Sequence, residues 1–194
     1  MSDDSSIQLS RPLNILAVSG SLRKASSNSL LVQAIQHLAP AGVAIEVWDD
    51  LDALPHFNPD LDVEDAPRIE AVQSWREKVK SADGVVLCTP EYAAGVPGSF
   101  KNALDWLVGS GDLADRPVAA ISASPYPTAG EHAHTSLMLT LGMLGARVPE
   151  GAQLKIGLIN RKISPQGEII DPELKEALKK VLFVLAESVI GQPV

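Results

Sequence analysis

The stretch Leu13-Asn-Ile-Leu-Ala-Val-Ser19, which runs directly into Gly20-Ser21, decides the fold of this chain. It is a short apolar run that ends in a Gly-Ser turn, a pattern typical of a β-strand buried on both faces. Apolar residues at helical spacing follow over residues 28–38. The stretch therefore predicts the first strand of a sheet, with a helix after it.

The same alternation continues along the chain. Four further apolar runs predict strands, and four amphipathic segments between and after them predict helices. We expect the strands at residues 43–48, 84–89, 117–122 and 152–159, and the helices at 68–81, 99–108, 131–144 and 172–189. Short apolar strands that alternate with helices predict an α/β fold, a doubly wound five-stranded parallel sheet in a three-layer α/β/α sandwich.

Two segments fall outside this alternation. Residues 1–12 are polar and have no period, so we expect a flexible lead-in before one domain that spans residues 13–194. Residues 49–67 are rich in Pro and Asp and also lack a period. A loop of this length is more than a connection between elements, and we expect it to be functional.

Composition and charge exclude several classes of function. With 45% hydrophobic and 21% charged residues, the chain has the composition of a globular protein. Its 16 basic and 24 acidic residues give a net charge of −8, which repels nucleic acid and anionic lipid, and no basic run reverses this locally. No apolar run reaches the roughly 18 residues that cross a bilayer, and the first six residues are acidic and polar. We therefore expect a cytoplasmic protein that binds neither nucleic acid nor membrane.

Neither the cysteine nor the histidines indicate catalysis or a metal site. Cys88 is the one cysteine, so an internal disulfide and a thiolate metal cage are excluded, and its place in an apolar strand predicts a buried thiol. His132 and His134 are close in sequence, but side chains two positions apart on a helix point in different directions. No G-x-S-x-G motif is present. We assign no catalytic side chain and no metal ligand.

The loop after the first strand has the composition of a phosphate site. In an open parallel sheet, ligands bind beyond the carboxyl ends of the strands. The segment Gly20-Ser-Leu-Arg-Lys-Ala-Ser-Ser-Asn-Ser29 brings four serine hydroxyls, an asparagine and an arginine to a helix N-terminus. Backbone N–H groups, the helix dipole and Arg23 would all stabilise a phosphate. The alternative is a helix N-cap with a solvated arginine. Dinucleotide and P-loop motifs are absent.

The loops after the third and fourth strands each present one tyrosine. Two prolines and two glycines stiffen the loop after Thr89, and Tyr92 at its tip could meet a flat ligand or pack on the next loop. Glu91 could cap a turn or face water. The loop over residues 122–130 carries Tyr126 and could equally be an ordinary connection between a strand and a helix.

Together these loops resemble those of the NADPH-dependent FMN reductases, the flavodoxin-like family that includes chromate and quinone reductases. The resemblance rests on Gly20-Ser-Leu-Arg-Lys with Ser26 and Asn28, on Pro90-Glu-Tyr through Pro97-Gly to Lys101-Asn-Ala-Leu-Asp-Trp106, and on Ser122-Ala-Ser-Pro125. It spans roughly residues 14–189. The resemblance implies a flavodoxin-like fold and a bound FMN, with the phosphate on the first loop and the ring against the second. The residues that it implies for cofactor binding are Ser21, Arg23, Ser26, Asn28, Ser29, Pro90, Glu91, Tyr92, Ala93, Gly95 and Ser124.

The activity that this resemblance implies is transfer of a hydride from NADPH or NADH through FMN to a quinone, a metal oxyanion or a similar small-molecule acceptor, or reduction of free flavin. Backbone N–H groups near Ser124 would stabilise the reduced flavin. Two positions depart from the family pattern. Ala93 stands where Asn is usual, and Ala129-Gly-Glu-His132 replaces Gly-Gly-x-Arg. The second change removes a positive charge, so we expect weak discrimination between NADPH and NADH.

Two other classes share these features and stay open. An electron-transfer flavodoxin-like protein would have the same fold and cofactor, and a non-enzymatic binding module could keep the fold without flavin. Relatives form dimers and tetramers, so the resemblance also implies a homodimer or homotetramer. Leu54, Pro55 and Phe57 of the long loop are the surface that we expect a neighbouring subunit to cover.

Overall fold

The structure is a computed structural model that describes residues 11–23 and 25–191. Residues 11 and 12 are the part of the predicted flexible lead-in (residues 1–12) that is described, so the expectation for this segment lies outside the described residues. Among the helices described, none is long and apolar enough to cross a membrane.

Five parallel strands form one sheet. They are β1 (Leu13–Ser19), β2 (Val43–Trp48), β3 (Gly84–Thr89), β4 (Val118–Ala123) and β5 (Gln153–Ile156), in the order β2-β1-β3-β4-β5. The chain winds outward from β1 in one direction to reach β2, and then in the other direction from β3 onward. The strand order therefore reverses between β1 and β3, which makes this pair the topological switch point of the sheet.

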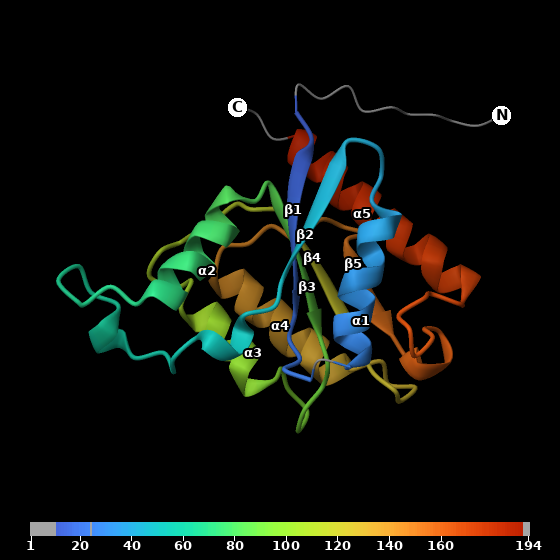
Figure 1. The fold of residues 1–194 in the computed structure, drawn as a ribbon, viewed down its shortest axis with the longest axis horizontal. Helices are drawn as coiled ribbons and strands as arrows, with labels where there is room; N and C mark the ends of the chain where they lie inside the picture. The colour runs from blue at the N-terminus through green and yellow to red at the C-terminus, as the bar shows by residue number, and fades with distance from the viewer. Residues whose placement is uncertain (1–10, 24, 192–194) are drawn as a thin grey trace.

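Helices cover both faces of the sheet, as Figure 1 shows. On one face lie α1 (Ser27–Ala34), which continues as the 3₁₀ turn η1 (Ile35–Leu38), and α5 (Pro172–Ile190). On the other lie α2 (Glu70–Ser81), α3 (Gly98–Asp105) and α4 (Glu131–Met143). The predicted doubly wound three-layer α/β/α sandwich is confirmed.

Alternation along the strands produces the two cores. Leu16, Val18 and Leu87 face α2, α3 and α4, whereas Ile15 and Val86 face α1 and α5. Successive side chains of a strand point to opposite faces, so a run that is apolar throughout is buried on both sides. Each residue of β3 and β4 is buried. The central strands are thus held rigidly, and the loops at their ends extend from a fixed frame.

The fifth strand is shorter than predicted. The apolar pattern predicts residues 152–159, but β5 ends at Ile156 and the 3₁₀ turn η4 (Ile159–Arg161) follows. A side chain at Gly157 would place its Cβ 2.9 Å from Pro127 O, and Leu158 is in the left-handed region with φ 54°. The chain therefore turns toward the loop after β4 instead of continuing the strand.

The long loop after β2 is fixed to the body of the protein over its first half. Leu51 begins the 3₁₀ turn η2 (Leu51–Ala53), and both Leu51 and Leu54 are buried in the core beside α2 and α3. Pro55 O accepts hydrogen bonds from Asn102 Nδ2 and from Trp106 Nε1, each at 2.9 Å. The expectation that Leu54 covers a neighbouring subunit is therefore wrong, since this side chain fills the core of its own chain.

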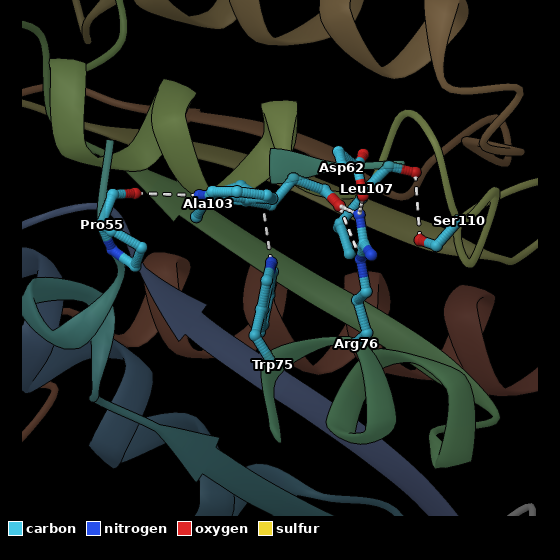
Figure 2. Close-up of polar contacts among 8 residues, drawn as sticks. Pro55, Asp62, Trp75, Arg76, Ala103, Leu107 and Ser110 are labelled. Atoms are coloured by element: carbon cyan, nitrogen blue, oxygen red, sulfur yellow. Dashed lines mark hydrogen bonds and ion pairs between the residues drawn. The ribbon is translucent and has the colours of Figure 1, made fainter. Parts of the chain in front are cut away.

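The second half of this loop projects beyond α2 in Figure 1, where it contains the 3₁₀ turn η3 (Pro59–Leu61). It is tied back at Asp62, which accepts a hydrogen bond from Arg76 Nη2 of α2 at 2.6 Å. Figure 2 shows this ion pair, the bond from Trp106 to Pro55, and the neighbouring bond from Trp75 Nε1 to Ala103 O at 2.8 Å. The outer part of the loop exposes Leu61 and Val63.

Candidate functional site: three loops at the carboxyl edge of the sheet

Three loops begin side by side at the switch point. The parallel register pairs Ser19, the last residue of β1, with Cys88 of β3, and it pairs Thr89, the last residue of β3, with Ser122 of β4. The N–H of Gly20 continues the ladder by donating to Cys88 O at 2.8 Å. The loops after β1, β3 and β4, which the sequence indicates as functional, therefore emerge from one edge of the sheet.

A cluster of hydroxyl groups lies in the loop between β1 and α1. Ser29 Oγ is 3.1 Å from Ser19 Oγ and 2.9 Å from Ser26 Oγ. Ser26 is the N-cap of α1, and its hydroxyl accepts from Ser29 N at 3.0 Å. The first intrahelical bond runs from Leu30 N to Ser26 O. Ser27 and Asn28 come before Leu30 in the helix, so their N–H groups are among the first-turn donors that have no acceptor within the helix. This arrangement suits an anion.

Arg23 lies in the same loop and carries the kind of charge that an anion site needs. Its side chain is exposed, and within residues 11–23 and 25–191 no ion pair involves it. Ser21, by contrast, is buried, and its Oγ accepts from Arg23 N at 3.3 Å. Gly20 lets the loop pack closely on α3, since a Cβ there would lie 2.6 Å from Phe100 Cδ1. Hydroxyls, a helix N-terminus and a free guanidinium fit the phosphate of FMN.

Asn28 lies at the same helix end, but its side chain points into the protein. It is 4% exposed. Its Nδ2 donates to Ala123 O at 3.1 Å, and its Oδ1 accepts from Cys88 Sγ at 3.2 Å. The side chain of Asn28 thus bonds to β3 and β4. The group that Asn28 can offer to an anion at the start of α1 is therefore its backbone N–H.

The loop after β3 ends in a tight turn. Tyr92 and Gly95 exchange two backbone hydrogen bonds of 3.0 and 3.1 Å, and the two residues between them, Ala93 and Ala94, have φ values of 49° and 60°. Two successive left-handed residues define the mirror-image turn that favours Asn and Gly. Pro90 is buried, while Tyr92 is 49% exposed. The turn therefore presents an aromatic face and strained backbone at the site.

Glu91 connects this loop to α4. Its Oε2 accepts from His132 N at 2.9 Å and from Ala133 N at 3.1 Å. The N-cap of α4 is Gly130, which has no side chain to satisfy these donors. The sequence leaves two roles open for Glu91, a cap on the following turn or a side chain that faces water. In the structure Glu91 is a cap, but it caps α4 and not the following turn.

The loop after β4 is held by internal hydrogen bonds. Ser122 Oγ donates to Ala129 O at 2.7 Å, and Ser124 Oγ accepts from Tyr126 N at 3.2 Å. The N–H of Ser124 donates to Ile156 O at 2.9 Å. These N–H groups of Ser124 and Tyr126 already have acceptors within the protein, so neither is free to act as the donor that the resemblance implies for a reduced flavin.

The segment after β5 supports two of the three loops, and sequence reasoning missed it. Ile159 N donates to Ser124 O at 3.0 Å, and Ser27 Oγ of α1 donates to Asn160 Oδ1 at 2.7 Å. The one available signal was Gly157 inside the expected strand, because a glycine within a strand pattern indicates close approach of another backbone.

Charges around the site are mostly acidic or already paired. A cavity of about 410 Å³ beside the loop between β1 and α1 is lined by Ser21 and Ser29 and also by Asp49, Asp50 and Asp52. At the start of α4, Glu131 forms an ion pair with Lys155 at 3.3 Å. In the described part of the chain, no three His, Cys, Asp or Glu side chains are grouped to hold a metal ion.

Two buried groups near the site have shifted pKa values. Burial raises the pKa of the Cys88 thiol to about 12. Burial also lowers the pKa of His134, whose Nε2 lies 3.4 Å from Gln153 Oε1 and whose buried Nδ1 has no hydrogen-bond partner among the described residues. Both groups are therefore neutral at pH 7.

Comparison with known proteins gives a consistent result. The family model "NADPH-dependent FMN reductase" matches residues 13–160. The quinone reductase of Escherichia coli is 32% identical over 182 residues, which cover 92% of this chain and 96% of that protein. An NAD(P)H-dependent FMN reductase of Pseudomonas aeruginosa is 30% identical and covers 91% and 95%. The solved structure of FerB, a flavoenzyme NAD(P)H:(acceptor) oxidoreductase from Paracoccus denitrificans, has a TM-score of 0.80 at 27% identity, over 92% of this chain and 97% of that chain.

Proposed function

Because the chain belongs to the NADPH-dependent FMN reductase family, we propose that it is an FMN-dependent oxidoreductase that transfers hydride equivalents from NAD(P)H to quinones. The family match covers residues 13–160, and the relatives that carry quinone reductase and FMN reductase names align over nine-tenths of the chain. The observation that carries the proposal is the candidate anion site at the β1/β3 switch point, where a hydroxyl cluster and the first turn of α1 share one loop with Arg23, whose side chain forms no ion pair among the described residues.

The protein's part in this reaction is to bind and orient. Ser26, Ser29 and the first-turn N–H groups of α1 would hold the phosphate, with Arg23 pairing its charge. The turn from Tyr92 to Gly95 and the loop after β4 would bracket the ring. When bound, FMN supplies the hydride acceptance and the electron transfer that no side chain here performs. No general acid or nucleophile is assigned.

The charges favour neutral quinones over metal oxyanions as acceptors. Asp49, Asp50 and Asp52 line the cavity beside the phosphate loop, and Lys155 is paired with Glu131. An oxyanion would meet this acidic surface and a net charge of −8. A neutral planar quinone has no such barrier, and the exposed rings of Tyr92 and Tyr126 on two of the loops suit it.

One experiment tests the proposal against the two alternatives. The purified protein is saturated with FMN, and NADPH oxidation is followed with 1,4-benzoquinone and, separately, with chromate. We expect a flavin absorption spectrum and steady-state turnover that is faster with the quinone. A yellow protein without NAD(P)H oxidation would indicate an electron-transfer flavodoxin-like protein. A protein that does not bind FMN would indicate a binding module.

We further propose that residues 13–194 form one domain, that the protein acts in the cytoplasm, and that it assembles as a homodimer or homotetramer. The outer half of the long loop is the surface proposed for contact with a neighbouring subunit, because it projects from the body and exposes Leu61 by 38% and Val63 by 58%. Sedimentation of a 20.5 kDa species alone at micromolar concentration would contradict the assembly.

A further inference from the structure

We propose that Cys88 is a positioning residue for the phosphate site: its thiol holds the Asn28 side chain, which fixes the first turn of α1 against the carboxyl ends of β3 and β4. The inference rests on the proposed function in one respect, since it takes the ligand of that turn to be the phosphate of FMN. Cys88 itself does not touch the ligand.

The contacts form a short chain between three elements. Cys88 Sγ donates to Asn28 Oδ1 at 3.2 Å, and Asn28 Nδ2 donates to Ala123 O at 3.1 Å. Cys88 is the second-last residue of β3, Asn28 the second residue of α1, and Ala123 the last residue of β4. These are the elements next to the three loops of the site, so one amide group sets their relative position.

The orientation of this amide follows from its neighbours. A backbone carbonyl only accepts hydrogen bonds, and Ala123 O therefore selects Nδ2, which leaves Oδ1 toward the thiol. Burial raises the pKa of Cys88 to about 12, so the thiol keeps its proton at neutral pH and stays a donor. Cys88 is 0% exposed and Asn28 4% exposed, so water does not replace the thiol if it is removed. Loss of the Sγ donor would leave Oδ1 buried and unpaired.

The amide is directly connected to the groups that would bind phosphate. Asn28 lies between Ser27 and Ser29, and Ser29 contributes its hydroxyl and its N–H to the cluster around Ser26. A rotation of the Asn28 side chain away from the strands would move the first turn of α1 and its N–H groups. Since those donors must converge on one anion, a small displacement weakens binding.

The family resemblance implies a competing role for Asn28, namely direct contact with the phosphate. The two roles differ in what they predict for Cys88. If Asn28 binds the phosphate directly and independently of the thiol, Cys88→Ala leaves FMN affinity unchanged, whereas under positioning Cys88→Ala weakens binding and its effect depends on Asn28. A double-mutant cycle between the two residues separates these outcomes.

The experiment measures FMN dissociation constants by fluorescence quenching for the wild type, Cys88→Ala, Cys88→Ser, Asn28→Ala and the double variant Cys88→Ala/Asn28→Ala. We expect Cys88→Ala to weaken binding by about threefold to tenfold, the range of one neutral hydrogen bond. Cys88→Ser, which keeps a donor, should remain within about twofold of the wild type, by the same reasoning. In the Asn28→Ala background, Cys88→Ala should have no further effect.

Val86→Ala is the matched control. Val86 is buried in the same core, on the same strand and face, two residues before Cys88. It should lower the melting temperature of the apoprotein without changing FMN affinity. Hydrogen exchange at the first turn of α1 in the apoprotein should be faster in Cys88→Ala and unchanged in Val86→Ala. Wild-type affinity in Cys88→Ala, or effects that add in the double variant, would overturn the inference, while absent FMN binding in the wild type would overturn the proposed function as well.

Discussion

The Glu91 carboxylate of the loop after β3 caps α4 by accepting from the N–H of His132 at 2.9 Å, across 41 residues of sequence. A second bond reaches it from Ala133 N at 3.1 Å. A carboxylate at a helix N-terminus is stabilised both by these donors and by the helix dipole. The bond also fixes the position of the loop after β3 relative to the loop that leads into α4.

Removing this cap should destabilise the protein. We expect Glu91→Ala to lower the free energy of unfolding by about 0.5–2 kcal/mol, as for other lost caps. Glu91→Gln should lie between Ala and the wild type, because it keeps an acceptor but loses the charge. Urea unfolding of the apoprotein measures both. Equal stability of Glu91→Ala and the wild type would show that solvent satisfies the two N–H groups.

The turn at Ala93 and Ala94 stores backbone strain that glycine can release. An L-residue with φ near 60° costs about 1–2 kcal/mol, whereas glycine adopts that conformation freely. Since glycine also gains entropy in the unfolded chain, we expect Ala94→Gly to raise the free energy of unfolding by about 0.5–1 kcal/mol. Ala39→Gly is the control, since Ala39 has φ −56° and should lose stability instead. Thermal unfolding that shifts the same way in both variants would contradict the account.

Arg23→Ala should weaken FMN binding by about 1.5–3 kcal/mol, the contribution of a charge-assisted hydrogen bond, and the remaining affinity should depend less on salt. Arg68→Ala removes the same charge from an exposed position just before α2 and should bind FMN as the wild type does. Fluorescence titration at two ionic strengths compares the three proteins. The same dissociation constant in both variants would mean that Arg23 does not pair with the phosphate.

The choice between NADPH and NADH should be weak and adjustable at Glu131. Lys155 offsets the Glu131 charge at 3.3 Å, and both side chains are solvent-exposed, so neither strongly attracts nor repels a 2′-phosphate. We expect kcat/KM for the two nucleotides to differ by less than about a hundredfold, under roughly 2.7 kcal/mol. Glu131→Arg should move the ratio toward NADPH, and Glu150→Arg should not. A ratio that charge reversal leaves unchanged would place Glu131 away from the nucleotide.

The stability of the protein should depend on pH through His134. Burial lowers the pKa of His134 in the folded protein, whereas histidine in an unfolded chain titrates near about 6.5. Between these two pKa values the unfolded chain binds more protons, so the free energy of unfolding falls as the pH drops below about 6.5. The slope should stay under about 1.4 kcal/mol per pH unit, the limit for one proton.

His134→Leu should remove this part of the pH dependence, and with it the buried Nδ1 that has no hydrogen-bond partner in the described part of the chain. The exposed neighbour His132 provides the control, since His132→Leu should keep the pH dependence. Urea unfolding between pH 5 and 8 distinguishes the two. An unchanged pH profile in His134→Leu would assign the dependence to another group.

Several features could be predicted from the sequence because they depend on residues close together in the chain. The apolar run over Leu13–Ser19 predicts a strand buried on both faces, and the apolar spacing over residues 28–38 predicts the helix that follows, which the structure has as α1 and η1. The alternation of such runs with amphipathic segments predicts the three-layer sandwich. Each of these predictions rests on the period of a strand or a helix. Such a period is set by residues that are close together in the chain, so it can be recognised without knowledge of the tertiary structure.

The partners of polar side chains were decided by the tertiary structure. Glu91 bonds to the start of α4, Asn28 bonds to β3 and β4, and Leu54 enters the core. The family resemblance implied a ring contact for Glu91 and a phosphate contact for Asn28, and Leu54 was expected on a subunit surface. Burial and hydrogen bonding at these positions depend on crossover connections that bring residues 41 to 95 positions apart into contact. The sequence by itself determined the frame and the loops that carry the site, because their signals are local. Only the folded chain determined which donors those loops leave free for a ligand, because a buried polar group pairs with whichever partner the packing places beside it.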